Sequence, residues 1–165
     1  SEYPLLNITG MPMFDFSGQL ASVGTLASST SGVDEQESTK SSLPTVLLVD
    51  DDPDSLVLLS FILESFPCKV ICERDGEAAL ERLQQEKCDL VMLDVQLPGL
   101  SGLDVARILR SNPMNATLPI VAVTALARSQ DRAKILQAGC NRYISKPYLV
   151  EDIEALINQY ITRSS

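Results

Sequence analysis

The sequence predicts an α/β protein built on a doubly wound, five-stranded parallel sheet. Five short apolar segments of strand length alternate along the chain with five segments of helical periodicity. This alternation requires crossover connections, which make neighbouring strands parallel and place helices on both faces of the sheet. The first apolar segment, residues 45–49, is uninterrupted, as is typical of a strand buried on both faces.

The first strand is followed by an acidic run and a helix. Asp52 fits the N-cap and Pro53 the first helical position, because a carboxylate there accepts a free N–H group and proline lacks one. Apolar residues at three- and four-residue spacing extend this helix to about Phe66. Pro67 then ends it, since the residue before a proline avoids the helical conformation.

The remaining elements repeat this alternation. In order they are a strand at 69–72, a helix from 75–77 through 83, a strand at 90–93, a helix at 103–109, a strand at 120–123, a helix at 128–138, a strand at 142–145 and a last helix at 150–161. Gly139 is a natural residue to terminate the fourth helix, because glycine readily adopts the left-handed conformation at that position.

Composition divides the chain near residue 43. Residues 1–43 are rich in Ser and Thr and predict a flexible, disordered N-terminal tail. Two apolar patches within it, at 3–6 and 13–16, leave a short docking motif as an alternative. Residues 44–162 contain all the regular elements and form the predicted domain.

The charge balance argues against several functions. The chain of 165 residues carries 13 Lys and Arg against 22 Asp and Glu, a formal net charge of −9. Such acidity disfavours nucleic acid and membrane surfaces as partners, and no apolar run approaches the roughly 20 residues of a bilayer span. The chain has no His, which excludes Ser–His and Cys–His catalysis and the usual His-containing metal sites.

The cysteines indicate the compartment. None of the four belongs to a C-x-x-C pair, and we expect them to be buried as small hydrophobic side chains. No secretory signal begins the sequence. These features together predict a reduced, cytoplasmic protein.

Polar residues follow four of the predicted strands, where sites form in doubly wound sheets. They are Asp50, Asp51, Asp94, Thr124 and Lys146. Converging carboxylates repel one another, and Mg²⁺ is the natural ion to offset that repulsion. A carboxylate, a metal and an ammonium also describe a phosphoryl-acceptor site, in which the carboxylate attacks phosphorus and the cations neutralise the phosphoryl oxygens. Taken alone, the acidic run could simply cap a helix.

Four motifs in chain order make residues 44–162 resemble the receiver (response regulator) domain family of two-component phosphorelay systems, and the resemblance implies that family's flavodoxin-like (βα)5 fold. Each motif lies at the end of a predicted strand, which makes a joint coincidence improbable. The motifs are Val49-Asp50-Asp51, Leu93-Asp94-Val95-Gln96-Leu97-Pro98-Gly99-Leu100-Ser101-Gly102, Val123-Thr124-Ala125 and Ser145-Lys146-Pro147.

The resemblance implies a metal-binding set around the phosphorylated aspartate. Asp94 would accept the phosphoryl group. Asp51 and Asp94 would bind Mg²⁺ directly, with the main-chain carbonyl of Gln96 as a third protein ligand and Asp50 acting through water.

The resemblance also implies how the phosphoryl group is contacted and sensed. Thr124 and Lys146 would contact it, and the bond before Pro147 would be cis. Tyr143 occupies the position of the family's switch aromatic. Phosphorylation would then change the surface formed by the last two helices and the strand between them.

These observations predict a phosphoacceptor that is not an enzyme. The donor histidine must come from a partner histidine kinase or His phosphotransfer protein, because this chain has none. No further module follows residue 162, so output through protein–protein contacts is expected, with a homodimer as one form of it. The alternatives are a receiver excised from a hybrid histidine kinase, an aspartyl-phosphatase-like enzyme, a flavin-binding protein and a receiver that only binds.

Overall fold

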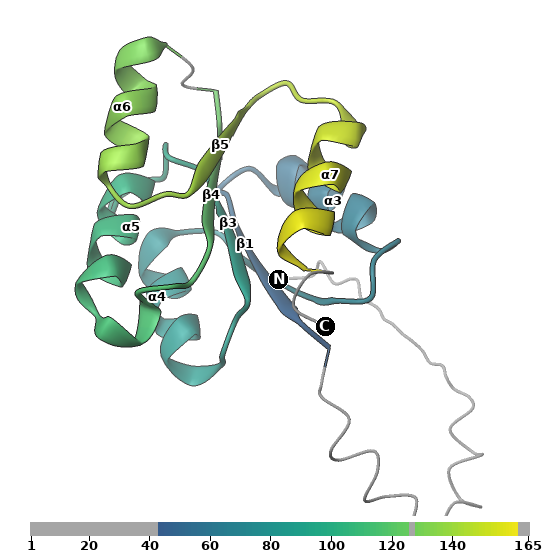
Figure 1. Cartoon of the computed structure of the whole chain (residues 1–165), viewed down its shortest axis with the longest axis horizontal. Coiled ribbons are helices and arrows are strands. Elements are labelled where there is room, and N and C mark those ends of the chain that lie inside the picture. Colours follow the sequence, from purple (N-terminus) through teal and green to yellow (C-terminus); the bar gives the residue numbers. More distant parts are fainter. Residues whose placement is uncertain (1–42, 126–127, 162–165) are drawn as a thin grey trace, which may run out of the picture. The chain divides into compact units, whose positions relative to one another are not determined.

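The computed structural model describes residues 43–125 and 128–161 (Figure 1). The predicted tail, residues 1–43, lies outside the described residues except for Leu43. The described part alternates strands with helices throughout. In chain order the elements are β1 (Thr45–Val49), α3 (Pro53–Leu63), β2 (Lys69–Glu73), α4 (Gly76–Gln85), β3 (Leu90–Leu93), α5 (Gly102–Ser111), the short 3₁₀ helix η2 (Pro113–Asn115), β4 (Ile120–Thr124), α6 (Ser129–Gln137), β5 (Arg142–Ser145) and α7 (Val150–Tyr160).

The five strands form one parallel sheet in the order β2-β1-β3-β4-β5. Helices α4, α5 and α6 lie on one side of this sheet, and α3 and α7 lie on the other (Figure 1). This architecture confirms the predicted doubly wound fold. Within the described residues, no helix is both long enough and apolar enough to span a bilayer.

The core consists of two apolar layers separated by the sheet. Alternate residues of each strand face opposite layers, because side chains in a strand alternate with a period of two. In β1, Leu47 and Val49 pack in the layer under α4, α5 and α6, whereas Val46 and Leu48 pack in the layer under α3 and α7. All four are at most 2% exposed, which explains why this strand is apolar without interruption.

The helix starts follow the capping signals in the sequence. The side chain of Asp52 accepts a hydrogen bond from the N–H of Asp54 at 3.0 Å, and Pro53 is the first helical residue, as predicted. At the other end α3 stops at Leu63, three residues before the predicted Phe66. Residues 64–66, which were expected to be helical, form turns instead, and the N–H of Phe66 donates to the carbonyl of Leu63 at 3.0 Å. Pro67 disfavours the helical conformation at Phe66, so its influence reaches back into the helix.

The cysteines are free thiols in hydrophobic surroundings. Cys88 and Cys140 are buried, while Cys68 and Cys72 are half-buried and pack together with the layer under α3 and α7. The expectation of cysteines that act as small hydrophobic side chains is therefore confirmed for the two buried residues and holds in part for the other two.

Candidate functional site

The order of the strands changes direction between β1 and β3, and the aspartates lie at this point. β1 has β2 on one side and β3 on the other. The main-chain N–H of Asp94 donates to the carbonyl of Val49 at 2.9 Å, and that of Asp50 donates to the carbonyl of Glu73 at 3.2 Å. These bonds continue the sheet by one residue and hold both aspartates at the carboxyl ends of adjacent strands, where sites form in open α/β sheets.

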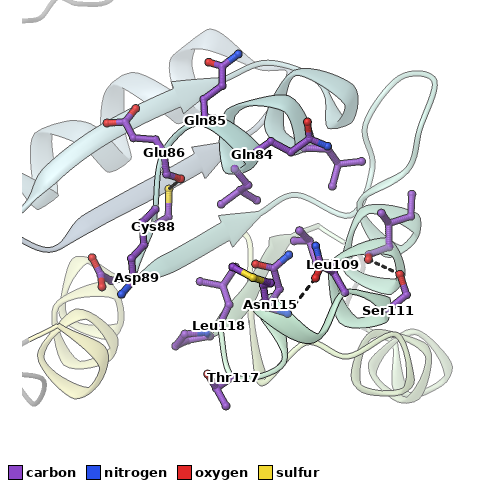
Figure 2. A pocket seen from close by; sticks show the side chains of 17 residues that line it. Gln84, Gln85, Glu86, Cys88, Asp89, Leu109, Ser111, Asn115, Thr117 and Leu118 are labelled. Carbon is purple, nitrogen blue, oxygen red and sulfur yellow. Dashed lines mark hydrogen bonds between the residues drawn. The ribbon is translucent and has the colours of Figure 1, made fainter.

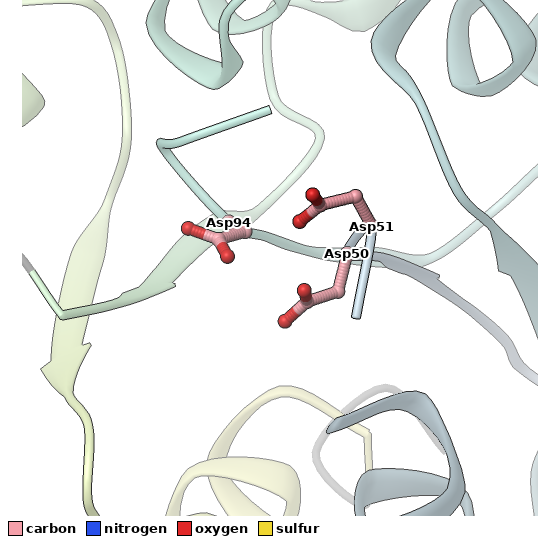
Figure 3. Close-up of side chains that lie close together, drawn as sticks. All are labelled: Asp50, Asp51 and Asp94. Atoms are coloured by element: carbon pink, nitrogen blue, oxygen red, sulfur yellow. The ribbon is translucent and has the colours of Figure 1, made fainter. Parts of the chain in front are cut away.

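Three carboxylates converge at this edge (Figure 3). One oxygen atom from each of Asp50, Asp51 and Asp94 lies within 4.8 Å of the others. Asp50 is 3% exposed and Asp94 is 6% exposed, whereas Asp51 is open to solvent. The site therefore combines two buried carboxylates with one that a solvent-borne ion can reach directly.

Lys146 supplies a positive charge to the two buried carboxylates. Its Nζ lies 2.7 Å from Oδ2 of Asp50 and 3.2 Å from Oδ2 of Asp94. The lysine follows β5, so residues from three strand ends meet at one ammonium group. The bond between Lys146 and Pro147 is cis, as the resemblance implied.

The second oxygen of each buried carboxylate accepts a main-chain hydrogen bond. Oδ1 of Asp50 accepts from the N–H of Asp52 at 2.9 Å, and Oδ1 of Asp94 accepts from the N–H of Gln96 at 2.9 Å. Both are bonds to the residue two positions ahead, the pattern by which aspartate stabilises a tight turn. The turns fix the direction in which each carboxylate points.

The ionisation of the site reflects burial and pairing. Burial raises the pKa of Asp94 above its ordinary value, although the N–H of Gln96 and the charge of Lys146 act in the opposite direction. Burial by itself would lower the pKa of Lys146, but the hydrogen bond to Asp50 and the charges of Asp94 and Asp50 together raise it. The lysine therefore remains a cation throughout the physiological range.

Thr124 ends β4 and is fully buried. Its main-chain carbonyl accepts the N–H of Lys146 at 2.9 Å, which couples the ends of β4 and β5. Tyr143 lies on β5, half-buried against the layer under α4, α5 and α6. The guanidinium of Arg132 lies 5.5 Å from the centre of the Tyr143 ring. A move at Thr124 therefore has a direct main-chain route to the strand that carries Tyr143.

Ser55 is a site residue that the sequence analysis missed. Its hydroxyl oxygen lies 3.4 Å from Nζ of Lys146 and donates to Oδ2 of Asp52 at 3.2 Å. Ser55 is in the first turn of α3, directly after the acidic run. This position in the sequence could have identified Ser55 as a site residue, because the first turn of a helix that follows a strand faces the strand ends.

A groove of about 1040 Å³ opens at the other end of the sheet, among the last turns of α4 and α5 and the residues before β3 and β4 (Figure 2). Apolar side chains such as Leu83 and Leu118 and polar ones such as Asn115 line it. None of the predicted site residues contributes to it. Convergent charged groups therefore mark the strand ends, and not this groove, as the candidate site.

The donor set fits a divalent cation that prefers oxygen. Three carboxylates within 4.8 Å of one another offer hard oxygen ligands, and the exposure of Asp51 leaves room for the water that Mg²⁺ retains. Thiolate and imidazole ligands, which favour zinc, do not belong to this cluster of described residues. The residues that would hold Mg²⁺ are Asp50, Asp51 and Asp94.

The fold and this arrangement of groups agree with a family comparison. The family model for the response regulator receiver domain matches residues 46–158. The chain belongs to the receiver domain family of two-component systems.

Individual relatives differ in length. The chain is 41% identical over 115 residues to the sensor histidine kinase GacS of Pseudomonas protegens. The aligned segment covers 68% of this chain but only 12% of GacS. It is 34% identical over 116 residues to the polar-differentiation response regulator DivK of Brucella anthropi, covering 70% of this chain and 94% of DivK. Among solved structures, the receiver domain of the sensor histidine kinase PA1611 from Pseudomonas aeruginosa superposes with a TM-score of 0.67 at 30% identity. That match covers 73% of this chain and 98% of the PA1611 domain, whose structure has a magnesium ion coordinated in the active site cleft.

Proposed function

We propose that this chain is a phosphoacceptor that takes a phosphoryl group onto Asp94 from a histidine on a partner protein. The observation that carries the proposal is the Lys146 ammonium, which lies within 3.2 Å of two buried carboxylates from different strands. A buried carboxylate held beside a cation is a nucleophile with a ready counter-charge for the incoming phosphoryl oxygens.

The transfer forms one bond and breaks another. An oxygen of Asp94 bonds to phosphorus while the bond from phosphorus to the donor nitrogen breaks, and the electron pair of that bond leaves with the donor imidazole. Lys146 neutralises charge on the phosphoryl oxygens. Mg²⁺, when bound at the aspartates, supplies further neutralisation of the same oxygens.

Asp51 would be the most accessible of the metal ligands, and the main-chain carbonyl of Gln96 would be a further ligand supplied by the protein. Asp51→Asn removes one anionic ligand and is expected to weaken Mg²⁺ binding and slow phosphorylation. A calorimetric titration with MgCl₂ measures the first effect. Phosphorylation that continues unchanged after chelation of Mg²⁺ would contradict the metal assignment.

The donor is a histidine kinase or a His phosphotransfer protein, because the chain itself contains no His. The chain spans 12% of GacS but 94% of DivK, so its relatives include both a sensor histidine kinase and a response regulator of about the length of the matched segment. The 41% identity to GacS favours the hybrid-kinase context as the second candidate. A cytoplasmic location is part of the proposal and is supported by four unpaired cysteines, which are typical of reducing compartments.

Output would pass through protein contacts on α6, β5 and α7. Three large apolar side chains on this surface or at its edge are at least 45% exposed, and they are Leu136, Leu149 and Val150. We assign the adjacent pair Leu149 and Val150, at the start of α7, to contact with a downstream protein or a second copy of the chain, because neighbouring exposed apolar side chains are typical of interaction surfaces. By contrast Ile153, Leu156 and Ile157 of α7 belong to the core.

The central experiment is phosphorylation by acetyl phosphate in the presence of Mg²⁺, followed by measurement of the intact mass. One phosphoryl group is expected on the wild-type chain and none on Asp94→Asn. Asp75→Asn is the matched control, because Asp75 caps α4 through a single oxygen that asparagine also provides. Labelling that persists in Asp94→Asn would show that another residue accepts the phosphoryl group. Steady turnover of a phosphate ester would instead favour the phosphatase-like enzyme.

A further inference from the structure

The hydroxyl of Ser55 connects the ammonium of Lys146 with the start of α3. Its oxygen lies 3.4 Å from Nζ of Lys146 and 3.2 Å from Oδ2 of Asp52. Asp52 is the N-cap of α3, and its other oxygen accepts the N–H of Asp54 at 3.0 Å. Ser55 is therefore held from one side by the helix cap and contacts the lysine from the other.

The contacts of Lys146 match the number of its donors. A lysine ammonium has three N–H groups and no acceptor. Three oxygens lie within hydrogen-bond distance of Nζ, at 2.7 Å in Asp50, 3.2 Å in Asp94 and 3.4 Å in Ser55. Because Lys146 accepts nothing, the Ser55 oxygen must be the acceptor of that contact, and its own proton is then free to point at Asp52.

We infer that Ser55 is a positioning residue that fixes the Lys146 ammonium between the two buried carboxylates. The inference rests on the proposed function, in which Lys146 neutralises the incoming phosphoryl group. Two of the three oxygens are charged carboxylates, and one of these is the nucleophile. Ser55 is the neutral third acceptor, and it draws the ammonium toward α3 and away from a closer pairing with Asp94.

Loss of the hydroxyl changes the balance at the ammonium. In Ser55→Ala the third N–H turns to water, and the ammonium is no longer held toward α3. The cation is then less well placed for the phosphoryl oxygens, which slows transfer by about three- to tenfold for the loss of one hydrogen bond to a charged group. Mg²⁺ affinity is not expected to change, since Ser55 does not belong to the carboxylate cluster.

The test compares three variants in the full chain. Ser55→Ala removes the hydroxyl, and Ser55→Thr keeps it and is the rescue variant. Ser65→Ala is the matched control, because Ser65 lies just beyond the other end of the same helix and donates to the carbonyl of Ile62 at 3.0 Å. Circular dichroism establishes that each variant is folded.

Two readouts separate positioning from a structural effect. The first is hydrogen exchange of the Lys146 ammonium in the unphosphorylated protein, observed in ¹H–¹⁵N spectra and assigned by its loss in Lys146→Arg. The second is the rate of phosphorylation by acetyl phosphate at saturating Mg²⁺, together with Mg²⁺ affinity. Ser55→Ala should exchange at least about threefold faster and react about three- to tenfold more slowly, with Mg²⁺ affinity within about twofold of wild type. Ser55→Thr and Ser65→Ala should resemble the wild type.

The inference is overturned if Ser55→Ala leaves the Lys146 exchange unchanged, if Ser55→Thr fails to restore it, or if Ser65→Ala has the same effect. A parallel loss of Mg²⁺ affinity in Ser55→Ala would also overturn it, by showing that the aspartates have moved with the helix start. If the wild-type chain accepts no phosphoryl group, the proposed function fails. The exchange measurement still decides the position of Lys146 in that case.

Discussion

The ammonium of Lys146 lies 3.2 Å from Oδ2 of Asp94, so the proposed nucleophile is ion-paired before any phosphoryl group arrives. Asp94 is 6% exposed, and burial raises its pKa. An isolated buried carboxylate would tend to take up a proton and lose its nucleophilic oxygen. The lysine opposes this tendency, and the same cation is then in place to meet the phosphoryl oxygens.

Lys146→Ala is expected to destabilise the metal-free protein. The substitution leaves Asp50 and Asp94 buried without their cation, at a cost of about 2 kcal/mol in the free energy of unfolding. This figure is below the range for fully buried pairs because the lysine side chain is 23% exposed. Urea unfolding in EDTA measures the loss, and Mg²⁺ should reduce it by replacing the missing charge.

The control for this prediction is Lys69→Ala. Lys69 pairs with Glu86, but its side chain is 55% exposed, so the expected loss is below about 1 kcal/mol. Equal stability of Lys146→Ala and wild type in EDTA would contradict the role given to this ion pair.

Gly102→Ala is expected to disturb the acceptor aspartate. A Cβ atom at Gly102 would lie 2.1 Å from the main-chain oxygen of Asp94 and 2.8 Å from Cα of Val95. These are backbone atoms, so the start of α5 must move away from the end of β3, at a cost of about 3 kcal/mol or more. Thermal unfolding gives the loss of stability, and phosphorylation by acetyl phosphate should slow in parallel.

Gly99→Ala provides the comparison. Gly99 has a φ of +73°, but a Cβ there meets nothing within 4 Å. The expected loss is about 1 kcal/mol from the left-handed conformation alone. If the two variants lose the same stability, close packing at Gly102 is not what holds α5 against Asp94.

Thr124→Ala should separate phosphorylation from the response of the surface. Thr124 is buried and its main chain is bonded to Lys146, so a phosphoryl group on Asp94 can draw the end of β4 inward through the hydroxyl. The variant is expected to accept a phosphoryl group but to lose the accompanying change around Tyr143. Backbone chemical shifts of residues 128–161, with and without a phosphoryl mimic, measure it. A wild-type surface that does not respond to the mimic would contradict the switch.

The cysteine thiols should react slowly at mildly alkaline pH. Burial raises the pKa of Cys68, Cys88 and Cys140 to about 11. At pH 8 only about one thiol in a thousand is then ionised, and the thiolate is the reactive form. Alkylation by iodoacetamide, followed by mass spectrometry, should be about a hundredfold slower than in guanidinium and should rise with pH from 8 to 9.5. Reaction with a midpoint near pH 8.5 in the folded protein would contradict this.

Removal of residues 1–42 should leave phosphorylation unchanged. The family model matches residues 46–158, and every proposed site residue follows Val49. Intact mass after treatment with acetyl phosphate and Mg²⁺ tests the shortened chain against the full one. A large loss of phosphorylation would show that the N-terminal segment contributes to the acceptor domain.

Much of the fold was predictable because its signals are local. The apolar run of β1, the Asp52 and Pro53 start of α3 and the glycine after α6 each follow from properties of a few adjacent residues. Gly139 has a φ of +110°, as its predicted place after the helix requires. The end of α3 was wrong by three residues, because the competition between helix and turn before Pro67 depends on more than periodicity.

The α7 segment shows what periodicity leaves open. Its apolar residues could all have belonged to the core by spacing alone. In the structure Ile153 is buried while Val150 is 45% exposed, because only one side of the helix packs against the sheet and α3. The 3₁₀ turn of η2 was not predicted, since a three-residue element has no periodicity to detect.

The sequence by itself determined the succession of strands and helices and the chemical groups that end each strand, because both depend on local patterns and on the rule that parallel strands end at one edge. Only the tertiary structure decided the placement of Lys146 between Asp50 and Asp94 and its contact with Ser55. Ser55 and Lys146 are 91 positions apart in the chain. A contact over that separation depends on how the two faces of the sheet are filled, and no local pattern encodes it.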